Sequence, residues 1–227
     1  MPKRAPIEPE GYYHVGSRGT YGIAIVRDDE EREMFLAGYE RATTKFGIKT
    51  LTWALKQNHH HFVVKLTAGG LSQAMRELHG PYSRQIHAKY GLTRQGHLFR
   101  HGFFAHHLPD FGAVLDACRY VDLNGYLPWR RTRRGRWVWC GYPALMGWDP
   151  PRGFHSPEDL LTLLDEDLET ARGQYRAYVA EEVARRARLA ADIKKPLPSP
   201  GRPEFSDFLF GSSPNQREEF ATFRPRG

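Results

Sequence analysis

The stretch Asn58-His59-His60-His61-Phe62-Val63-Val64 decides how this chain is interpreted. Alternate side chains of a β-strand share a face, so the imidazoles of His59 and His61 would lie about 6 to 7 Å apart on one face, where both can hold one metal ion. The residues that alternate with this pair, Phe62, Val64 and Leu66, are apolar, and they predict that the other face of the strand is turned toward the core. His60 falls on this core parity.

Three consecutive histidines can also be exposed polar filler, a purification tag, or a core histidine that bonds one backbone carbonyl. A tag is disfavoured because tags are terminal and longer, whereas this run is internal and opens an apolar strand. The run alone leaves metal binding and a structural role both open.

Composition indicates a globular protein. The 227 residues are 40% hydrophobic and 13% aromatic, enough for one large domain or for one domain with an appendage. No stretch approaches the ~18 uncharged apolar residues of a membrane span, and the first residues lack the apolar run of a signal peptide. Two cysteines, Cys118 and Cys140, are too few for a disulfide scaffold. We therefore expect a soluble, cytoplasmic, nucleoid-associated protein without a membrane partner.

The charge favours a polyanionic partner. The formal net charge is +7 at pH 7, and binding to phosphates releases their condensed counterions. The excess positive charge is concentrated in arginines, whose planar guanidinium groups can form bidentate hydrogen bonds with phosphate oxygens. These are Arg130, Arg131, Arg133, Arg134 and Arg136. Nucleic acid is the expected partner, and a solvated basic loop is the plainer alternative.

Hydrophobic periodicity predicts the element order βαββαβ. Alternation predicts strands over residues 12–17, 48–56 and from 59 onward, the last two joined as a hairpin. Spacings of three and four predict helices over residues 28–45 and 71–90, and an aromatic segment, 98–108, supplies a further strand. With histidines on the open face and helices on the other, this order predicts an α+β, ferredoxin-like antiparallel sheet.

A helix that begins near Asp110 carries Tyr120 and Asn124 on one face. Side chains four residues apart have Cβ atoms ~5 to 6 Å from each other, so both can address one site. The common alternative is a tyrosine packed in the core and an asparagine that caps the helix end.

Three regions are expected along the chain. Residues 1–150 form the first domain, and residues 151–195 form a helical extension in which one helix runs from Ser156 toward Lys195. Residues 196–227 are rich in Pro, Ser, Gly and charge and are expected to be disordered or bound to a partner. Whether the extension packs on the first domain, dimerises or presents the tail to DNA stays open.

Four motifs follow one another in the first domain. They are Tyr13-His14-Val15 with Arg18-Gly19, then Asn58-His59-His60-His61, then Gly96-His97-Leu98-Phe99, and Arg119-Tyr120-Val121-Asp122-Leu123-Asn124. Their order and spacing resemble those of single-tyrosine HUH transposases, specifically the REP-associated tyrosine transposase group of IS200-like transposases. The resemblance covers about residues 12–147.

The resemblance implies a site and a reaction. In such enzymes the two histidines and a later polar residue bind a divalent metal, which implies His59, His61 and Asn124 with Mg²⁺ or Mn²⁺, although imidazole also suits zinc. The helix tyrosine, here Tyr120, would attack single-stranded DNA, become linked to a 5′ phosphate and leave a 3′ hydroxyl for rejoining. A phenol has a pKa of ~10 and needs a metal or base nearby, which is consistent with that role. The implied substrate is a REP-like hairpin, and a homodimer is compatible with it.

The chain departs from the family pattern in three places. His60 replaces a bulky apolar residue, so its imidazole needs a buried partner or the core must open locally. The usual Pro-Val-Arg-Ala after Asn124 is replaced by Gly125-Tyr126-Leu127-Pro128, and a usual basic residue is missing around Gly102. Two other functions therefore stay open, a domesticated nucleic-acid-binding protein without activity and a phosphodiesterase that activates water. The expected DNA contacts are Arg18, Arg130, Arg131, Arg133 and Arg134.

Overall fold

The computed structural model describes residues 6–91, 96–100, 102–127 and 137–192. The chain divides into two compact units, Met1–Ala180 and Glu181–Gly227. The domain boundaries predicted after residues 150 and 195 stay predictions, and the tail predicted to be disordered lies outside the described residues. Within the described part of the chain, none of the helices is both long and apolar enough to cross a membrane.

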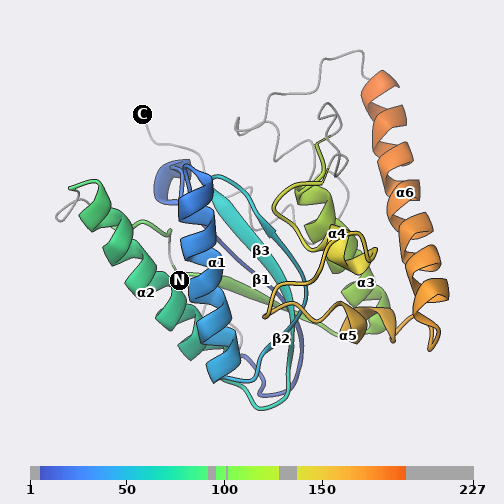
Figure 1. Ribbon diagram of the computed structural model, residues 1–227, viewed down its shortest axis with the longest axis horizontal. Helices are drawn as coiled ribbons and strands as arrows, with labels where there is room; N and C mark the ends of the chain where they lie inside the picture. The colour runs from blue at the N-terminus through green and yellow to red at the C-terminus, as the bar shows by residue number, and fades with distance from the viewer. Residues whose placement is uncertain (1–5, 92–95, 101, 128–136, 193–227) are drawn as a thin grey trace. The chain divides into compact units, whose positions relative to one another are not determined.

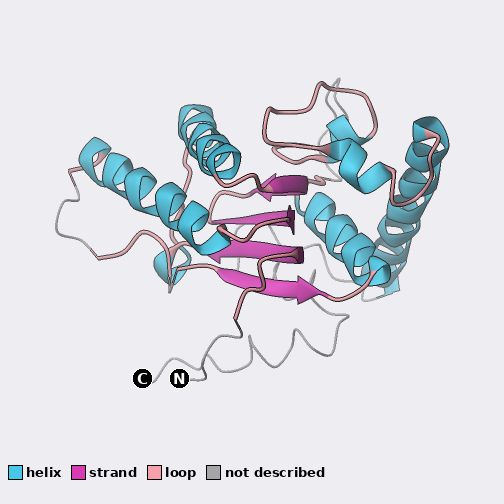
Figure 2. Ribbon diagram, turned by 90° about the horizontal axis from the view of Figure 1, so that it is seen from below, coloured by secondary structure: helices cyan, strands magenta, loops and turns pink. Residues whose placement is uncertain are grey.

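A four-stranded antiparallel sheet organises the first unit (Figure 2). Strands β1 (Gly11–Arg18), β2 (Lys49–Leu55), β3 (His59–Leu66) and β4 (Phe104–Leu108) lie in the order β2-β3-β1-β4. Together with the helices between them they give the predicted βαββαβ sequence of elements, so the α+β, ferredoxin-like sheet is confirmed. Strand β4 is shorter than predicted, because the chain turns at Gly102, whose φ is +80°, and Phe99 forms only an isolated bridge with Gly19.

Helices α1 (Asp29–Lys45) and α2 (Leu71–Lys89) lie across one face of the sheet (Figure 1). Most of the alternate residues of β1 and β3 that face these helices are apolar, and all but His60 and Ser17 of the buried ones belong to the hydrophobic core. On α1 and α2, residues three and four apart, such as Phe35 and Tyr39 or Ala74 and Leu78, are buried against them. The stacked rings of Tyr39 and Phe62, with centroids 3.7 Å apart, join helix to strand at the centre of this core.

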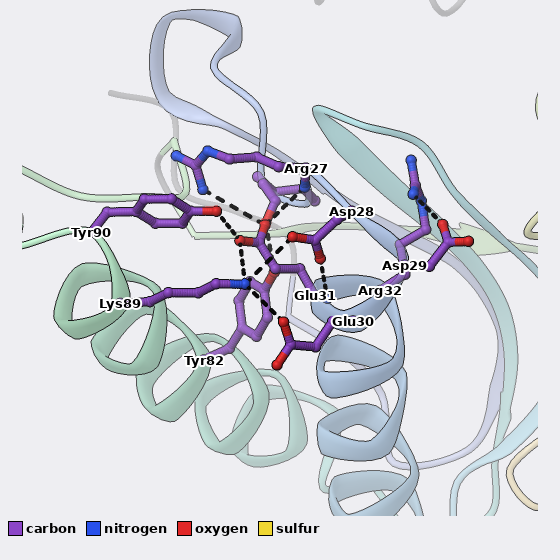
Figure 3. Close-up of polar contacts among 10 residues, drawn as sticks. Arg27, Asp28, Asp29, Glu30, Glu31, Arg32, Tyr82, Lys89 and Tyr90 are labelled. Atoms are coloured by element: carbon purple, nitrogen blue, oxygen red, sulfur yellow. Dashed lines mark hydrogen bonds and ion pairs between the residues drawn. The ribbon is translucent and has the colours of Figure 1, made fainter.

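A charged cluster joins the start of α1 to the end of α2 (Figure 3). Glu31 is fully buried, and its carboxylate accepts hydrogen bonds from the Tyr90 hydroxyl and from the backbone N–H of Arg27 at 2.8 Å. The Lys89 ammonium lies 3.3 Å from the same carboxylate. Burial on its own would raise the pKa of Glu31, but these hydrogen bonds outweigh burial and lower the pKa below its ordinary value.

We predict that Glu31→Gln destabilises the protein by about 1 to 3 kcal/mol at neutral pH, because buried donors lose a charged acceptor. The folded pKa lies below the unfolded value of about 4.5, so the carboxylate contributes its full stability above that pH and loses it as the pH falls through the folded pKa. Urea unfolding of wild type and variant from pH 3 to 8 measures this. Glu30→Gln, whose exposed carboxylate also contacts Lys89, should have a much smaller effect. A Glu31→Gln deficit that does not change with pH would contradict this assignment.

Helix α3 (Phe111–Asn124) packs against the opposite face of the sheet, mainly on β2. Its side chain Asp122 is fully buried and accepts hydrogen bonds from the Thr52 hydroxyl on β2 and from the Tyr175 hydroxyl at 2.6 Å. Burial raises the pKa of Asp122 to about 7, against the lowering effect of both hydrogen bonds. These bonds tie α3 to the strand that neighbours the histidine strand.

The segment after α3 forms three helices within the described residues, α4 (Tyr142–Leu145), α5 (Pro157–Leu161) and α6 (Leu168–Asp192). The prediction of one continuous helix from Ser156 toward Lys195 is wrong. Residues 162–167 separate α5 from α6, because the Asp167 carboxylate accepts from the backbone N–H of Thr170 at 2.8 Å and so starts a new helix. Pro157 does occupy the first turn of α5, and the backbone N–H of Ser156 donates to Thr50 on β2 at 2.9 Å.

Candidate active site on the histidine face

His59 and His61 lie on the face of the sheet that α1 and α2 leave open. Their ring centroids are 5.0 Å apart, and the rings are nearly perpendicular. Across the strand pairing, His61 is opposite Gly16 of β1, and His59 is opposite Arg18. The structure therefore brings together the two histidines that the alternation of the strand placed on one face.

Each of these two imidazoles is held by its Nδ1 atom. His59 Nδ1 lies 2.6 Å from the Asn58 side-chain oxygen, and His61 Nδ1 lies 3.0 Å from His14 Nε2. The Nε2 atoms of His59 and His61 are buried and have no hydrogen-bond partner among the described residues. A fixed Nδ1 with a free Nε2 is the arrangement in which histidines commonly ligate metals.

Asn124 supplies an oxygen beside the pair. Its side-chain Nδ2 donates to the backbone carbonyl of Tyr120 at 3.0 Å, which leaves Oδ1 to accept or to coordinate. The backbone carbonyl of Asn124 accepts from Lys56 Nζ at 2.7 Å, which fixes the end of α3 against the turn between β2 and β3. Asn124 is 6% exposed, so the residue as a whole is largely shielded from bulk water.

Burial keeps the histidines of the site neutral. Burial, together with the positive charges of Lys56 and Arg18, lowers the pKa of His59 to about 3, and the Asn124 side chain, as a hydrogen-bond acceptor, opposes this shift. The pKa of His61 is well below its ordinary value, first through burial and then through His59 and Lys56. Neutral imidazoles retain the lone pair that a metal ion needs.

The donor set fits a divalent ion that accepts both nitrogen and oxygen. Among the described residues, no group of three or more His, Cys, Asp or Glu side chains could hold a metal ion. An ion at this face would therefore depend on His59 Nε2, His61 Nε2 and Asn124 Oδ1, with its other ligands from solvent or substrate. Two imidazoles and one amide oxygen suit Mn²⁺ or Zn²⁺ better than Mg²⁺, which prefers oxygen.

Tyr120 lies at the edge of the same cluster. Its half-buried ring meets the His61 ring edge-on with centroids 5.5 Å apart, and its centroid is 5.6 Å from that of His14. Helix α3 therefore carries both the predicted nucleophile and the predicted oxygen ligand onto the histidine face. A tyrosine in this position can reach a phosphate that also contacts the histidines.

Of the predicted DNA contacts, Arg18 is at this site. Its Nε atom is buried and has no hydrogen-bond partner within the described ranges, and no acidic side chain there forms an ion pair with it. The other predicted contacts lie outside the described residues, and their roles stay predictions. They are Arg130, Arg131, Arg133 and Arg134.

His14 has no predicted role beyond its place in a motif, and Lys56 has none at all. Contacts between distant segments bring both to the site. The pairing of β1 with β3 places His14 diagonal to His61, and Lys56 Nζ donates to the backbone carbonyl of Asn124 at the end of α3. The alternation of residues 12–17 could have placed His14 on the open face, because Tyr13 and Val15 are the core parity. The contact between His14 and His61 depends on the register of β1 against β3, which the sequence does not state.

His60 has the buried partner that its position requires. The side chain is fully buried, and its Nε2 lies 3.0 Å from Nε2 of His79 on α2. The His60 ring also packs against Phe35 and Phe62, with centroids 5.1 and 4.9 Å away. The imidazole thus replaces an apolar core residue without turning the strand, and His59 and His61 keep their common face.

We predict that His14→Phe weakens Mn²⁺ binding by about 10- to 100-fold, because the hydrogen bond that orients His61 is lost. His14→Gln should retain most of the affinity, since its amide oxygen can still accept from His61 Nδ1. Isothermal titration calorimetry with Mn²⁺ measures both, beside His61→Ala as the variant without the ligand and His107→Ala, an exposed histidine of β4, as the control. Equal affinities for wild type and His14→Phe would show that His14 does not position the ligand.

Comparison with known families gives a match over about half of the chain. Residues 9–123 match the family described as "Transposase IS200 like". The matched span contains His14, Arg18, His59, His61 and Tyr120, and ends one residue before Asn124. No curated protein sequence matches the chain.

Three solved structures are similar in part. A REP-associated tyrosine transposase bound to a REP hairpin is 14% identical, with 69% of this chain and 88% of that chain covered and a TM-score of 0.49. A candidate transposase from Deinococcus radiodurans R1 is 14% identical, with coverages of 49% and 89% and a TM-score of 0.37. A tRNA(His) guanylyltransferase from Saccharomyces cerevisiae is 12% identical, with coverages of 77% and 80% and a TM-score of 0.39. The family assignment rests on the sequence match.

Proposed function

Because the chain belongs to the IS200-like transposase family, we propose that it cuts and rejoins single-stranded DNA through a covalent bond between Tyr120 and a 5′ phosphate. The observation that carries the proposal is the convergence on one sheet face of the Tyr120 ring and two imidazoles whose buried Nε2 atoms have no hydrogen-bond partner among the described residues. A transposase role follows from the family itself; the nucleophile, the metal and the form of the DNA are our proposal.

In this proposal three residues bind the metal ion and a fourth is the nucleophile. His59, His61 and Asn124 would hold a divalent ion, which when bound polarises the scissile phosphate and offsets the negative charge that grows on it. Tyr120 attacks phosphorus, so that a bond from its phenolic oxygen forms while the bond to the 3′ oxygen breaks. The phenol loses its proton and the departing oxygen gains one, leaving a 3′ hydroxyl and a 5′ phosphotyrosine. Attack by a different 3′ hydroxyl reverses the step and joins a new strand without ATP.

Arg18 supports a phosphate near this chemistry. Its guanidinium is next to His59 across the strand pairing and has no acidic partner among the described residues, so a DNA phosphate is its natural counterion. The arginines predicted at positions 130–134 would extend the path of the backbone. The resemblance to REP-associated transposases makes a hairpin with a single-stranded flank the first substrate to test. A homodimer, which would bring two DNA ends together, is part of the proposal.

We predict that wild type forms a DNA adduct that survives denaturation when incubated with Mn²⁺ or Mg²⁺ and a labelled library of single-stranded oligonucleotides that contain hairpins. Tyr120→Phe should form none, because the ring remains but the attacking oxygen is gone. Tyr126→Phe, a tyrosine whose ring packs on Trp137, is the matched control and should form the adduct normally. Denaturing gel electrophoresis separates the shifted band from free DNA.

Two results would replace the proposal. Free cleaved DNA in both wild type and Tyr120→Phe would make water the nucleophile and leave a metal-dependent phosphodiesterase. Hairpin binding without any cleaved or linked product, under conditions where wild type is folded and loaded with metal, would make the chain a nucleic-acid-binding protein without catalytic activity.

We predict that Arg18→Ala flattens the dependence of log affinity on log salt by about 0.7 for a single-stranded oligonucleotide, the value expected for one lost phosphate contact. Arg41→Ala removes an exposed arginine of α1, on the covered side of the sheet, and should leave the slope unchanged. Fluorescence anisotropy at several salt concentrations gives both slopes. An Arg18→Ala slope equal to that of wild type would remove Arg18 from the DNA contacts.

A further inference from the structure

The loop between β1 and α1 presents a tyrosine to solvent beside the candidate active site. Tyr21 lies in a single 3-10 turn, Thr20–Gly22, and is 93% exposed. Its backbone has φ 53° and ψ 22°, the left-handed conformation, and Gly22 follows with φ +76°. Only two described residues other than glycine have a positive φ, and Tyr21 is one of them.

This conformation is unfavourable for tyrosine. For a residue with a Cβ the left-handed region is less favourable than the right-handed one, because the Cβ comes too close to the following carbonyl oxygen. At 93% exposure the Tyr21 ring gains almost no packing within the chain that could offset this cost. A glycine at the same position would fold without the strain. The ring is therefore best explained by a contact with something outside the chain.

The loop is held firmly at the edge of the site. The backbone N–H of Gly19 donates to the carbonyl of Asn58 at 2.8 Å, and that of Thr20 donates to the carbonyl of Leu98 at 2.9 Å. The Asn58 side chain, which fixes His59 Nδ1, also donates from Nδ2 to the carbonyl of Gly22 at 3.4 Å. Gly19 allows this packing, since a Cβ there would lie 2.1 Å from the carbonyl oxygen of Ile23. Tyr21 is thus displayed on a rigid turn that contacts the neighbour of a candidate metal ligand.

Arg18 lies beneath the same turn. One guanidinium nitrogen is 3.8 Å from the position that a Cβ of Gly22 would occupy. A cation without an acidic partner in the described residues and an exposed aromatic ring therefore stand together at the end of β1. This pairing of a phosphate-binding group with a stacking surface is how proteins hold single-stranded nucleic acid without reading its sequence.

We propose that Tyr21 is a stacking platform for a base of the single-stranded DNA that flanks the cleaved phosphate. The inference rests on the proposed function, because it needs single-stranded DNA at the histidine face. While Arg18 holds a backbone phosphate, the Tyr21 ring stacks on the base beside it and directs the strand toward Tyr120. Stacking needs no hydrogen bond, so this contact is tolerant of base identity and leaves sequence recognition to other residues.

The test is equilibrium binding of fluorescein-labelled (dT)20 by anisotropy, in a Tyr120→Phe background that cannot form the covalent bond. Tyr21→Gly removes the ring and relieves the backbone, and should weaken binding by about tenfold, within the range measured for one stacked base. Tyr21→Trp keeps a stacking surface and should retain the affinity. Trp148→Ala, which removes an exposed aromatic side chain after α4, should bind like the parent.

The salt dependence of DNA affinity distinguishes a stacking contact from a phosphate contact. Tyr21→Gly should lower the affinity equally at every salt concentration, because no phosphate contact is lost, whereas Arg18→Ala should change the slope. The melting temperature of Tyr21→Gly should stay near that of the parent, since the relief of strain opposes the greater freedom of the unfolded chain.

Four results would overturn the inference. Unchanged affinity of folded Tyr21→Gly, together with normal adduct formation by the protein that keeps Tyr120, would contradict the stacking role alone and leave the proposed function standing. A loss of affinity that Tyr21→Trp shares would show that the ring does not act as a stacking surface. A change in oligomeric state of Tyr21→Gly by light scattering, without a change in DNA affinity, would assign Tyr21 to contact between copies of the chain. Failure of the parent to bind (dT)20 at low salt would contradict both proposals.

Discussion

The antiparallel register of β1 against β3 is the constraint on which the candidate site depends. With Gly16 opposite His61 and Arg18 opposite His59, His14 falls diagonal to His61, close enough for their rings to share a hydrogen bond. A slip of one residue would turn every side chain of β1 to the other face and remove Tyr13 and Val15 from the apolar core. The apolar core beneath the sheet therefore fixes the geometry of the polar cluster above it.

The second requirement is the attachment of α3. Asp122 points into the protein between β2 and Tyr175, and its two hydrogen bonds hold the helix so that Tyr120 and Asn124 face the histidines. Lys56 binds the last carbonyl of the helix from the opposite side of the site. A buried carboxylate and a partly buried ammonium are costly to desolvate, and here each makes a hydrogen bond that positions a functional residue. Asp122 and Lys56 thus both hold α3 on the sheet and position the residues of the candidate site.

Local pattern was enough to predict the sheet, its two covering helices and the shared face of His59 and His61, because alternation and helical spacing are properties of neighbouring residues. The partners of those residues were not predictable, since His14, His79 and Lys56 meet them through contacts between distant segments. The break before α6 was missed because Asp167, the residue that starts the new helix, lies within a run of acidic residues that is equally typical of a helix surface. The catalytic, metal-binding and DNA-binding roles stay predictions that the geometry supports.

Mass spectrometry of the protein after reaction with single-stranded DNA, nuclease trimming and proteolysis tests the role of Tyr120 most directly. If Tyr120 is the nucleophile, the peptide that contains it carries the mass of a nucleotide joined through phosphate, and fragmentation places that mass on the tyrosine ring. Cleaved DNA together with an unmodified Tyr120 peptide, or a nucleotide found on another residue, would contradict the central claim.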